Sequence, residues 1–242
     1  MTKSSPPPVE RAFTLIEILV VMAIIAGLAA ILIPSLNSAL ERAKVAKDMS
    51  NLRQIGAATQ MYMNDNNGVL FSTTGSWMSQ LYNADNPAAS KYLSSWKIFV
   101  SPFDKRTSSA PSATSAISYG INGTAGVVGM SADRISKPTV FVVFAPAQKS
   151  GTTVSFQGTA NTTTQVALAN SAAITVVGIG GGQATSVPGG NAQGGTHNAR
   201  TKINALCADW HVESMLWSGT GPTFTNNTAT GTDPDGASRW SP

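Results

Sequence analysis

The feature that most constrains this chain is an almost uninterrupted apolar stretch near its N-terminus. Residues 13–33 read FTLIEILVVMAIIAGLAAILI, and Glu17 is the one ionisable side chain among them. A helix of this length covers roughly 30 Å, which matches the thickness of a bilayer's hydrocarbon core. A helix buried in a soluble core rarely runs so long without a polar face. The sequence therefore predicts a membrane-spanning helix over residues 13–34.

Glu17 is an unusual residue for such a helix. An acidic side chain deep in a transmembrane segment costs about 2.5–3.5 kcal/mol on insertion scales. Glu17 lies near one end of the stretch, which lowers this cost, and a cation at the same depth in an adjacent helix would relieve it best. We therefore expect a charged partner for Glu17. The alternative is a side chain that reaches the near membrane interface without a partner.

The residues before the stretch predict its orientation. Residues 1–12 read MTKSSPPPVERA, and the three consecutive prolines oppose a stable helix. Lys3 and Arg11 favour a cytoplasmic location for this segment, so the C-terminal bulk is expected on the other side of the membrane. A secretory cleavage site after the apolar stretch fits poorly, which leaves a cut before it, after Ala12, as the better prediction.

Residues 11–17, RAFTLIE, resemble the N-terminal processing motif of type IV pilins and of the pseudopilins of type II secretion systems. The resemblance implies that a membrane peptidase cuts before Phe13 and methylates the new amine. It also implies that Glu17 neutralises the N-terminal amine of a neighbouring subunit during assembly, and that Pro34 loosens or kinks the helix. The family strongly prefers Gly before the cut. Ala12 is the smallest alternative, so we expect slowed rather than abolished processing.

Residues 35–66 predict an amphipathic continuation of the same helix. An apolar stripe recurs at helical spacing, and the charged residues fall mostly outside it. The stripe comprises Leu36, Leu40, Ala43, Met49, Leu52, Ile55, Thr59 and Tyr62, and the charged set comprises Arg42, Lys44, Lys47, Asp48 and Arg53. Residues 64–68, NDNNG, should stop the helix, with Gly68 in a left-handed cap. The second half of the stripe is expected to pack on a domain.

Residues 67–242 predict a β-rich head. Charged residues make up only 12% of the chain, and the 242 residues suffice for one span and one domain. Strand-forming runs occur at residues 116–121 and 139–144, with weaker ones at 165–169 and 173–179. Residues 203–215 alternate about a short turn and predict a hairpin. Residues 150–199 lack Asp, Glu, Lys and Arg and are rich in Gly, Thr and Asn, so this segment is predicted to be an exposed insertion or a subunit-contact surface.

The C-terminal part is similar to a large group of pseudopilin-like proteins common in planctomycete- and verrucomicrobium-type bacteria. These proteins carry an upstream His, an Asp-Gly-His turn, a Cys-Pro segment, a Ser-Tyr-Gly-x-Asn run and a terminal Trp-x-Pro. The matching residues here are His197, residues 209–211 (DWH), Ser101 with Pro102, residues 118–122 (SYGIN) and residues 240–242 (WSP). Trp210 replaces the turn glycine, so a turn with positive φ there would be strained.

His197, Asp209 and His211 form the one His/Asp grouping in the sequence. Two imidazoles and a carboxylate could hold a divalent metal. The simpler interpretation, in which Asp209 and His197 bond the backbone and fix the turn, is favoured, and catalysis is the least favoured.

Two further features near the C-terminus carry weaker signals. Asp233 and Asp235 lie in a run similar to a calcium loop, but a solvated turn explains the spacing better. Cys207 is the chain's single cysteine, so it forms no intramolecular disulfide and is expected to be a small buried residue.

These observations predict an α+β protein in which a long N-terminal helix packs on an antiparallel sheet. The expected segments are a leader (1–12), a transmembrane assembly helix (13–34), its amphipathic continuation (35–66) and a periplasmic head (67–242). The predicted function is a structural filament subunit of a type II secretion or type IV pilus-like system. The alternative is a membrane-tethered module that binds glycan, protein or DNA without polymerising.

The partners implied are prepilin peptidase, related subunits and the bacterial inner membrane. The net charge of +4 is too small to indicate nucleic acid. No enzymatic activity, cofactor or small-molecule substrate is expected.

Overall fold

The structure, a computed structural model, divides into two units, Met1–Ala43 and Lys44–Pro242. It describes residues 14–72, 76–83, 90–106, 115–122, 127–148, 156, 167–168, 178–179, 196–198, 202–217 and 224–225.

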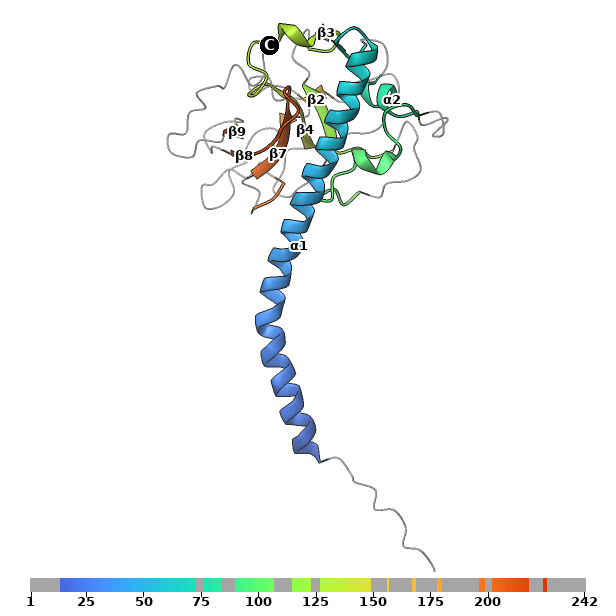
Figure 1. Cartoon of the computed structure of the whole chain (residues 1–242). Coiled ribbons are helices and arrows are strands. Elements are labelled where there is room, and N and C mark those ends of the chain that lie inside the picture. Colours follow the sequence, from blue (N-terminus) through green and yellow to red (C-terminus); the bar gives the residue numbers. More distant parts are fainter. Residues whose placement is uncertain are drawn as a thin grey trace, which may run out of the picture. The chain divides into compact units, whose positions relative to one another are not determined.

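The helix α1 runs over Leu15–Asp65 (Figure 1). It continues through Pro34, and the hydroxyl of Ser38 donates to the Pro34 carbonyl oxygen at 3.1 Å. At the other end the Gly68 N–H donates to the Met63 carbonyl oxygen at 2.8 Å, and Gly68 has a φ of 73°. A residue with positive φ closes a helix in this way because the chain must reverse at once. The predicted helix end and the left-handed Gly68 are confirmed.

The described strands of the head are β1 (Val69–Leu70), β2 (Tyr119–Asn122), β3 (Met130–Ser131), β4 (Val142–Gln148), β5 (Ala167–Leu168), β6 (Gly178–Ile179), β7 (Lys202–Cys207), β8 (Val212–Trp217) and β9 (Phe224–Thr225). They form one main sheet with the order β5-β2-β4-β7-β8-β9, in which β6 also pairs with β4. Most strand pairs are antiparallel, but β2 and β5 are parallel. The α+β class and the β7–β8 hairpin are confirmed.

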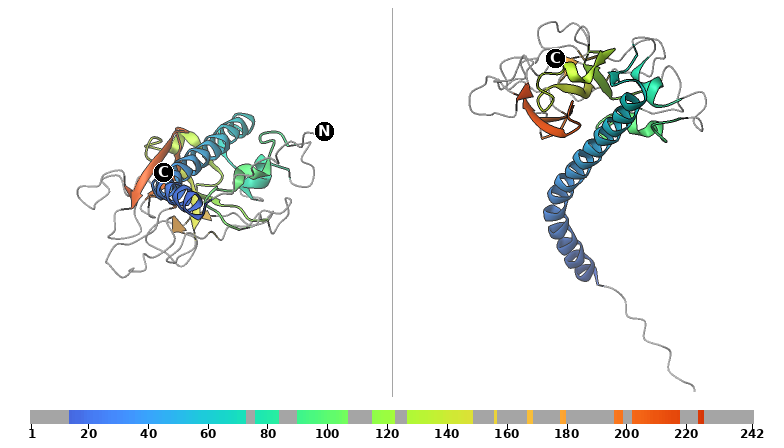
Figure 2. Two further views of the ribbon diagram at one scale, coloured as in Figure 1. Left: turned by 90° about the horizontal axis from the view of Figure 1, so that it is seen from below. Right: turned by 45° about the horizontal axis from the view of Figure 1, so that its top comes forward.

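Short helices complete the head. These are α2 (Trp77–Leu81) and two 3-10 turns, η2 (Trp96–Phe99) and η3 (Ala132–Arg134). The Ser76 side chain caps α2 by accepting from the Ser79 N–H, as expected for a serine before a helix. In Figure 2, α2 (teal) and the β7–β8 hairpin (orange) lie on opposite sides of the C-terminal half of α1.

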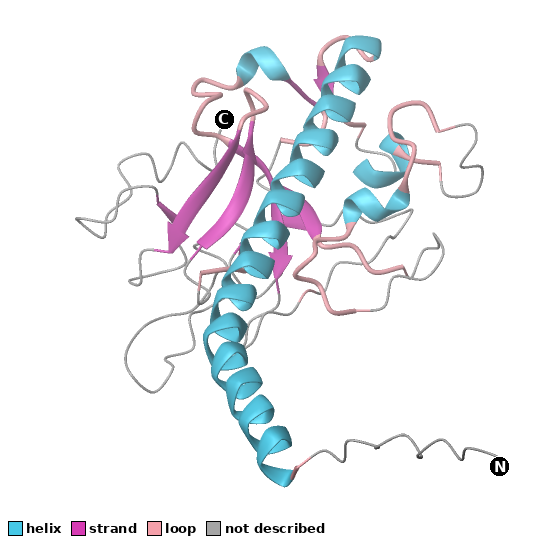
Figure 3. Ribbon diagram, turned by 60° about the horizontal axis from the view of Figure 1, so that its bottom comes forward, coloured by secondary structure: helices cyan, strands magenta, loops and turns pink. Residues whose placement is uncertain are grey.

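The C-terminal half of α1 lies across the strands of the main sheet (Figure 3). Leu52 and Ile55 are fully buried on this face. The packing is tight at Gly56, where an added Cβ would lie 3.1 Å from Leu206 of β7 and 3.5 Å from the Trp210 ring. Because Gly56 has no side chain, α1 can approach the hairpin this closely.

Aromatic rings fill the space between α1, α2 and the sheet. The Trp77 ring lies 4.7 Å from Phe144 of β4 and 5.4 Å from Phe99 of η2, measured between ring centroids. Phe71 lies 6.1 Å from Phe144 in an edge-to-face arrangement. Such tilted pairs are favourable because a ring's positive edge meets a negative face. These aromatic contacts join segments that are far apart in the sequence.

The close approach at Gly56 generates a prediction. Gly56→Leu should lower the free energy of unfolding of the head by about 1–3 kcal/mol, because the new side chain must displace Leu206 or Trp210. The matched control is Ala57→Leu at the next, exposed position, where a change within about 0.5 kcal/mol is expected. Thermal unfolding of the full chain in detergent measures both. Equal effects of the two variants would contradict the close packing.

Candidate functional site

The start of α1 is the first candidate region. Thr14 precedes the helix, and its backbone N–H and its hydroxyl both donate to Glu17 Oε2, at 2.9 and 2.7 Å. The Glu17 N–H donates back to Thr14 Oγ1 at 3.3 Å. This reciprocal arrangement is a capping box, which satisfies backbone donors at a helix start. Glu17 therefore has a local structural role that the sequence analysis missed, although the spacing Thr-x-x-Glu signals it. Ala12 and Phe13 lie outside the described residues.

The large apolar side chains of α1 that follow Glu17 are left mostly uncovered by the described residues. Every large apolar residue in the first part of α1 is at least half exposed, including Ile31 at 78% and Leu28 at 65%. Among the described residues, α1 is the one helix long and apolar enough to cross a membrane. Such an apolar surface needs lipid or other helices around it, because water contact with it is unfavourable. These findings fit anchoring in a membrane.

His197 does not join the other residues of the predicted His/Asp grouping. Its side chain is buried, with its ring stacked on Phe103 at a centroid distance of 5.7 Å. Its Nε2 lies 3.3 Å from Ser214 Oγ, and its backbone pairs with Lys202 at the start of β7. Asp209 lies in the turn beyond the far end of β7, and β7 itself spans roughly 17 Å at 3.4 Å per residue. The described geometry thus separates His197 from Asp209 and His211.

Asp209 and His211 do interact across the β7–β8 turn. Asp209 Oδ1 lies 2.5 Å from His211 Nδ1 and accepts the His211 N–H at 3.2 Å. Trp210 between them has a φ of 69°, the left-handed conformation that a glycine would take without strain. That conformation costs about 1–2 kcal/mol for a residue with a Cβ. The Trp210 ring is partly buried against the core and lies beside Gly56 of α1.

A buried carboxylate is the polar centre of the head. Asp48, fully buried on α1, accepts the Ser101 hydroxyl and the Tyr119 hydroxyl at Oδ1, both at 2.6 Å. The Asn204 side-chain amide donates to its Oδ2 at 2.9 Å. Burial raises the pKa of the Asp48 carboxyl, and the hydrogen bonds from Ser101, Tyr119 and Asn204 partly oppose this rise. One helix residue thereby binds three segments that are distant in sequence.

The charge pattern of residues 35–66 predicts Asp48 outside the buried stripe, and that prediction is wrong. Asp48 lies four, seven and eleven residues before Leu52, Ile55 and Thr59, all of which are buried on the same helix face. The helical spacing contained this signal. Charge alone argued against burial, because a carboxylate inside a protein needs partners that only the folded structure reveals.

The Ser101-Pro102 segment and the SYGIN run form a second polar cluster next to Asp48. The Ser118 hydroxyl donates to Asp104 Oδ2 at 2.8 Å and accepts the Ser101 N–H at 2.9 Å. Arg106 pairs with Asp104 at 2.7 Å and donates to the Ile117 carbonyl oxygen at 2.6 Å. The resemblance to pseudopilin-like proteins pointed to these two runs. Their role in this structure is structural, because their hydrogen bonds hold the two segments together. Asp233, Asp235 and residues 240–242 lie outside the described residues.

The described regions define a class of protein: an α+β head carried on a long helix whose first part is apolar and exposed. Comparison with known families adds one match, in which residues 8–33 fit the family described as Prokaryotic N-terminal methylation motif. This motif is the signature of type IV pilins and pseudopilins, which prepilin peptidase processes, and it indicates a structural subunit. Comparisons with curated proteins and with solved structures found no match.

Asp48 generates a prediction about stability. Asp48→Ala should lower the free energy of unfolding by roughly 2–5 kcal/mol, because it leaves three buried donors without an acceptor. Lys47→Ala, at the exposed neighbouring position, should change it by less than about 0.5 kcal/mol. Chemical denaturation followed by tryptophan fluorescence measures both variants. A loss no greater than that of Lys47→Ala would show that the network contributes nothing.

The raised pKa of Asp48 generates a second prediction, on pH dependence. The pKa of Asp48 is higher in the folded state than in the unfolded state. Its contribution to the free energy of unfolding is therefore fully present below the unfolded pKa, about 3.9. It is lost as pH rises through the folded pKa. Asp48→Asn has no titrating group, so the difference in unfolding free energy between wild type and this variant isolates Asp48. We expect the wild type to lose stability relative to Asp48→Asn as pH rises from about 4. A difference independent of pH would contradict the assignment.

Proposed function

We propose that this chain is a subunit of a pilin-like filament of the type II secretion or type IV pilus kind. The observation that carries the proposal is the methylation motif at residues 8–33, which coincides with the exposed apolar start of α1. In this proposal residues 13–34 hold the subunit in the inner membrane, with residues 1–12 in the cytoplasm and the head in the periplasm. Assembly then moves the helix from lipid into a bundle of like helices.

The distribution of burial along α1 supports this division of labour. The described residues before Lys44 are almost all exposed, whereas Asp48, Leu52, Ile55 and Thr59 are buried in the head. An apolar helix surface that its own chain leaves uncovered can be satisfied by lipid before assembly and by neighbouring helices after it. The head needs neither, because it has its own core. The same helix thus serves as anchor, assembly element and part of the fold.

In the proposed assembly Glu17 meets the methylated amine of Phe13 from an adjacent subunit. The carboxylate would be neutralised at the depth where it is otherwise costly, and the pairing would fix the axial offset between helices. The capping box with Thr14 supports this role, because it holds the Glu17 carboxylate at the helix start rather than letting it turn away. Pro34 is proposed to let the helix bend within the bundle.

The processing step gives the most direct test. Mass spectrometry of the protein isolated from cells that contain prepilin peptidase should identify a mature chain that starts at methylated Phe13. Ala12→Gly should increase the rate of cleavage, since Gly is the preferred residue there. A chain that retains Met1 under these conditions, in both wild type and Ala12→Gly, would overturn the proposal.

A substitution at Glu17 separates its two roles. Glu17→Gln keeps an acceptor for the Thr14 donors, since a capping box works with Glu or Gln, but it removes the charge. We expect normal membrane insertion and cleavage but loss of filaments, measured by electron microscopy and by crosslinking between subunits. Glu41→Gln, further along the same helix, should assemble normally. Wild-type chains that are processed but never crosslink to one another would instead indicate a tethered binding module.

A further inference from the structure

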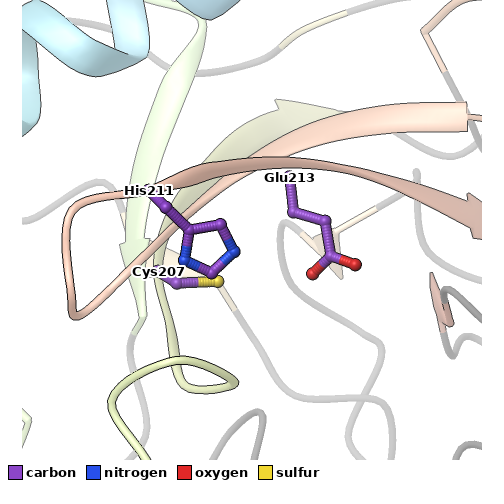
Figure 4. Close-up of side chains that lie close together, drawn as sticks. All are labelled: Cys207, His211 and Glu213. Atoms are coloured by element: carbon purple, nitrogen blue, oxygen red, sulfur yellow. The ribbon is translucent and has the colours of Figure 1, made fainter.

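The β7–β8 hairpin brings three potential metal ligands together at its turn. We propose that Cys207, His211 and Glu213 bind a divalent ion of the zinc class. One donor atom from each side chain lies within 4.8 Å of the other two, and Figure 4 shows the three side chains gathered on one side of the hairpin. This set differs from the grouping that the sequence suggested, because it includes Cys207 and leaves out His197.

Strand register explains why these residues meet. Ala205 pairs with Glu213, and the Cys207 N–H donates to the His211 carbonyl oxygen at 3.0 Å, so Cys207 stands opposite His211. Side chains two residues apart on a strand share a face, which places Glu213 beside His211. Leu206 points to the other face, toward α1. The three ligands therefore lie on the sheet face opposite the helix.

His211 is already oriented as a ligand. Its Nδ1 is held by Asp209 Oδ1 at 2.5 Å, which leaves Nε2 to bind an ion. Metal-binding histidines commonly donate their second ring N–H to a carboxylate, which fixes the tautomer and strengthens the ligand. In this arrangement Asp209 is a positioning residue and does not touch the ion.

The donor set and its exposure suit zinc. A thiolate, an imidazole and a carboxylate are all zinc ligands, and three protein ligands leave one tetrahedral position for water or for a partner. Cys207 is buried, Glu213 is half-buried and the His211 side chain is 42% exposed, so an ion can enter from the solvent side. The donors must approach to roughly 3.3–3.8 Å from each other, as expected for bonds of about 2.0–2.3 Å. On binding, the Cys207 thiol releases its proton to solvent.

Trp210 connects this site to the rest of the head. It occupies the turn between Asp209 and His211 with a positive φ, and its ring lies beside Gly56 of α1. An ion that joins the two sides of the hairpin would hold this strained turn in place. Bound metal should therefore stabilise the fold as well as occupy a surface site.

Cobalt titration of the full chain in detergent, after treatment with a chelator, tests the proposal. We expect one equivalent of Co²⁺ to produce visible tetrahedral bands and a thiolate charge-transfer band in the near ultraviolet, and Zn²⁺ to abolish both. Thermal unfolding should shift upward with Zn²⁺. Absence of the thiolate band at one equivalent of Co²⁺ would overturn the proposal.

Variants assign the ligands. Cys207→Ser should remove the charge-transfer band, and His211→Gln or Glu213→Gln should weaken Co²⁺ binding strongly. Asp209→Asn should keep the spectrum but weaken affinity about 10–100-fold, as for other positioning carboxylates. His197→Gln, which changes the chain's other histidine, is the matched control and should bind as wild type. If Cys207→Ser does not fold, Glu213→Gln is the variant that tests the site, because Glu213 occupies a half-exposed strand position. Binding that survives Glu213→Gln and His211→Gln unchanged would overturn the assignment.

Discussion

The head depends on one buried carboxylate. Asp48 projects from α1 and accepts hydrogen bonds from Ser101, from Tyr119 of β2 and from Asn204 of β7. A carboxylate inside a protein is unfavourable unless its oxygens are satisfied, so the fold is forced to bring these donors together. Apolar packing alone would tolerate several positions of a helix on a sheet. The directional bonds to Asp48 select one of them.

The same helix is exposed to two different environments. Its first part is apolar all round and mostly exposed among the described residues, and its last part is apolar on one face and covered by the sheet. Between these parts the helix remains continuous, since α1 spans Leu15–Asp65. The distribution of side chains along one helix therefore organises the packing of the head and, in the proposed filament, the assembly of subunits.

The sequence predicted much of the fold, and it failed where contacts between distant segments decide the outcome. The end of α1 at residues 64–68, a strand overlapping residues 139–144 (β4, Val142–Gln148) and the hairpin at 203–215 were predicted because periodicity and turn residues are local signals. Asp48 was misplaced because its partners come from residues 53, 71 and 156 positions away. The grouping of His197 with Asp209 was likewise an inference from residue type, which carries no information about which end of a strand each residue meets.

The sequence by itself determined the apolar helix, its processing motif and the alternation that makes the β7–β8 hairpin. These features follow from the hydrophobicity and the spacing of residues, and both are properties of the sequence itself. The tertiary structure alone decided that Asp48 is buried, that Trp210 takes a glycine's conformation and that Cys207 meets His211 and Glu213. The reason is physical: burial, backbone strain and ligand geometry depend on which segments meet in space, and that is settled by packing of the whole head.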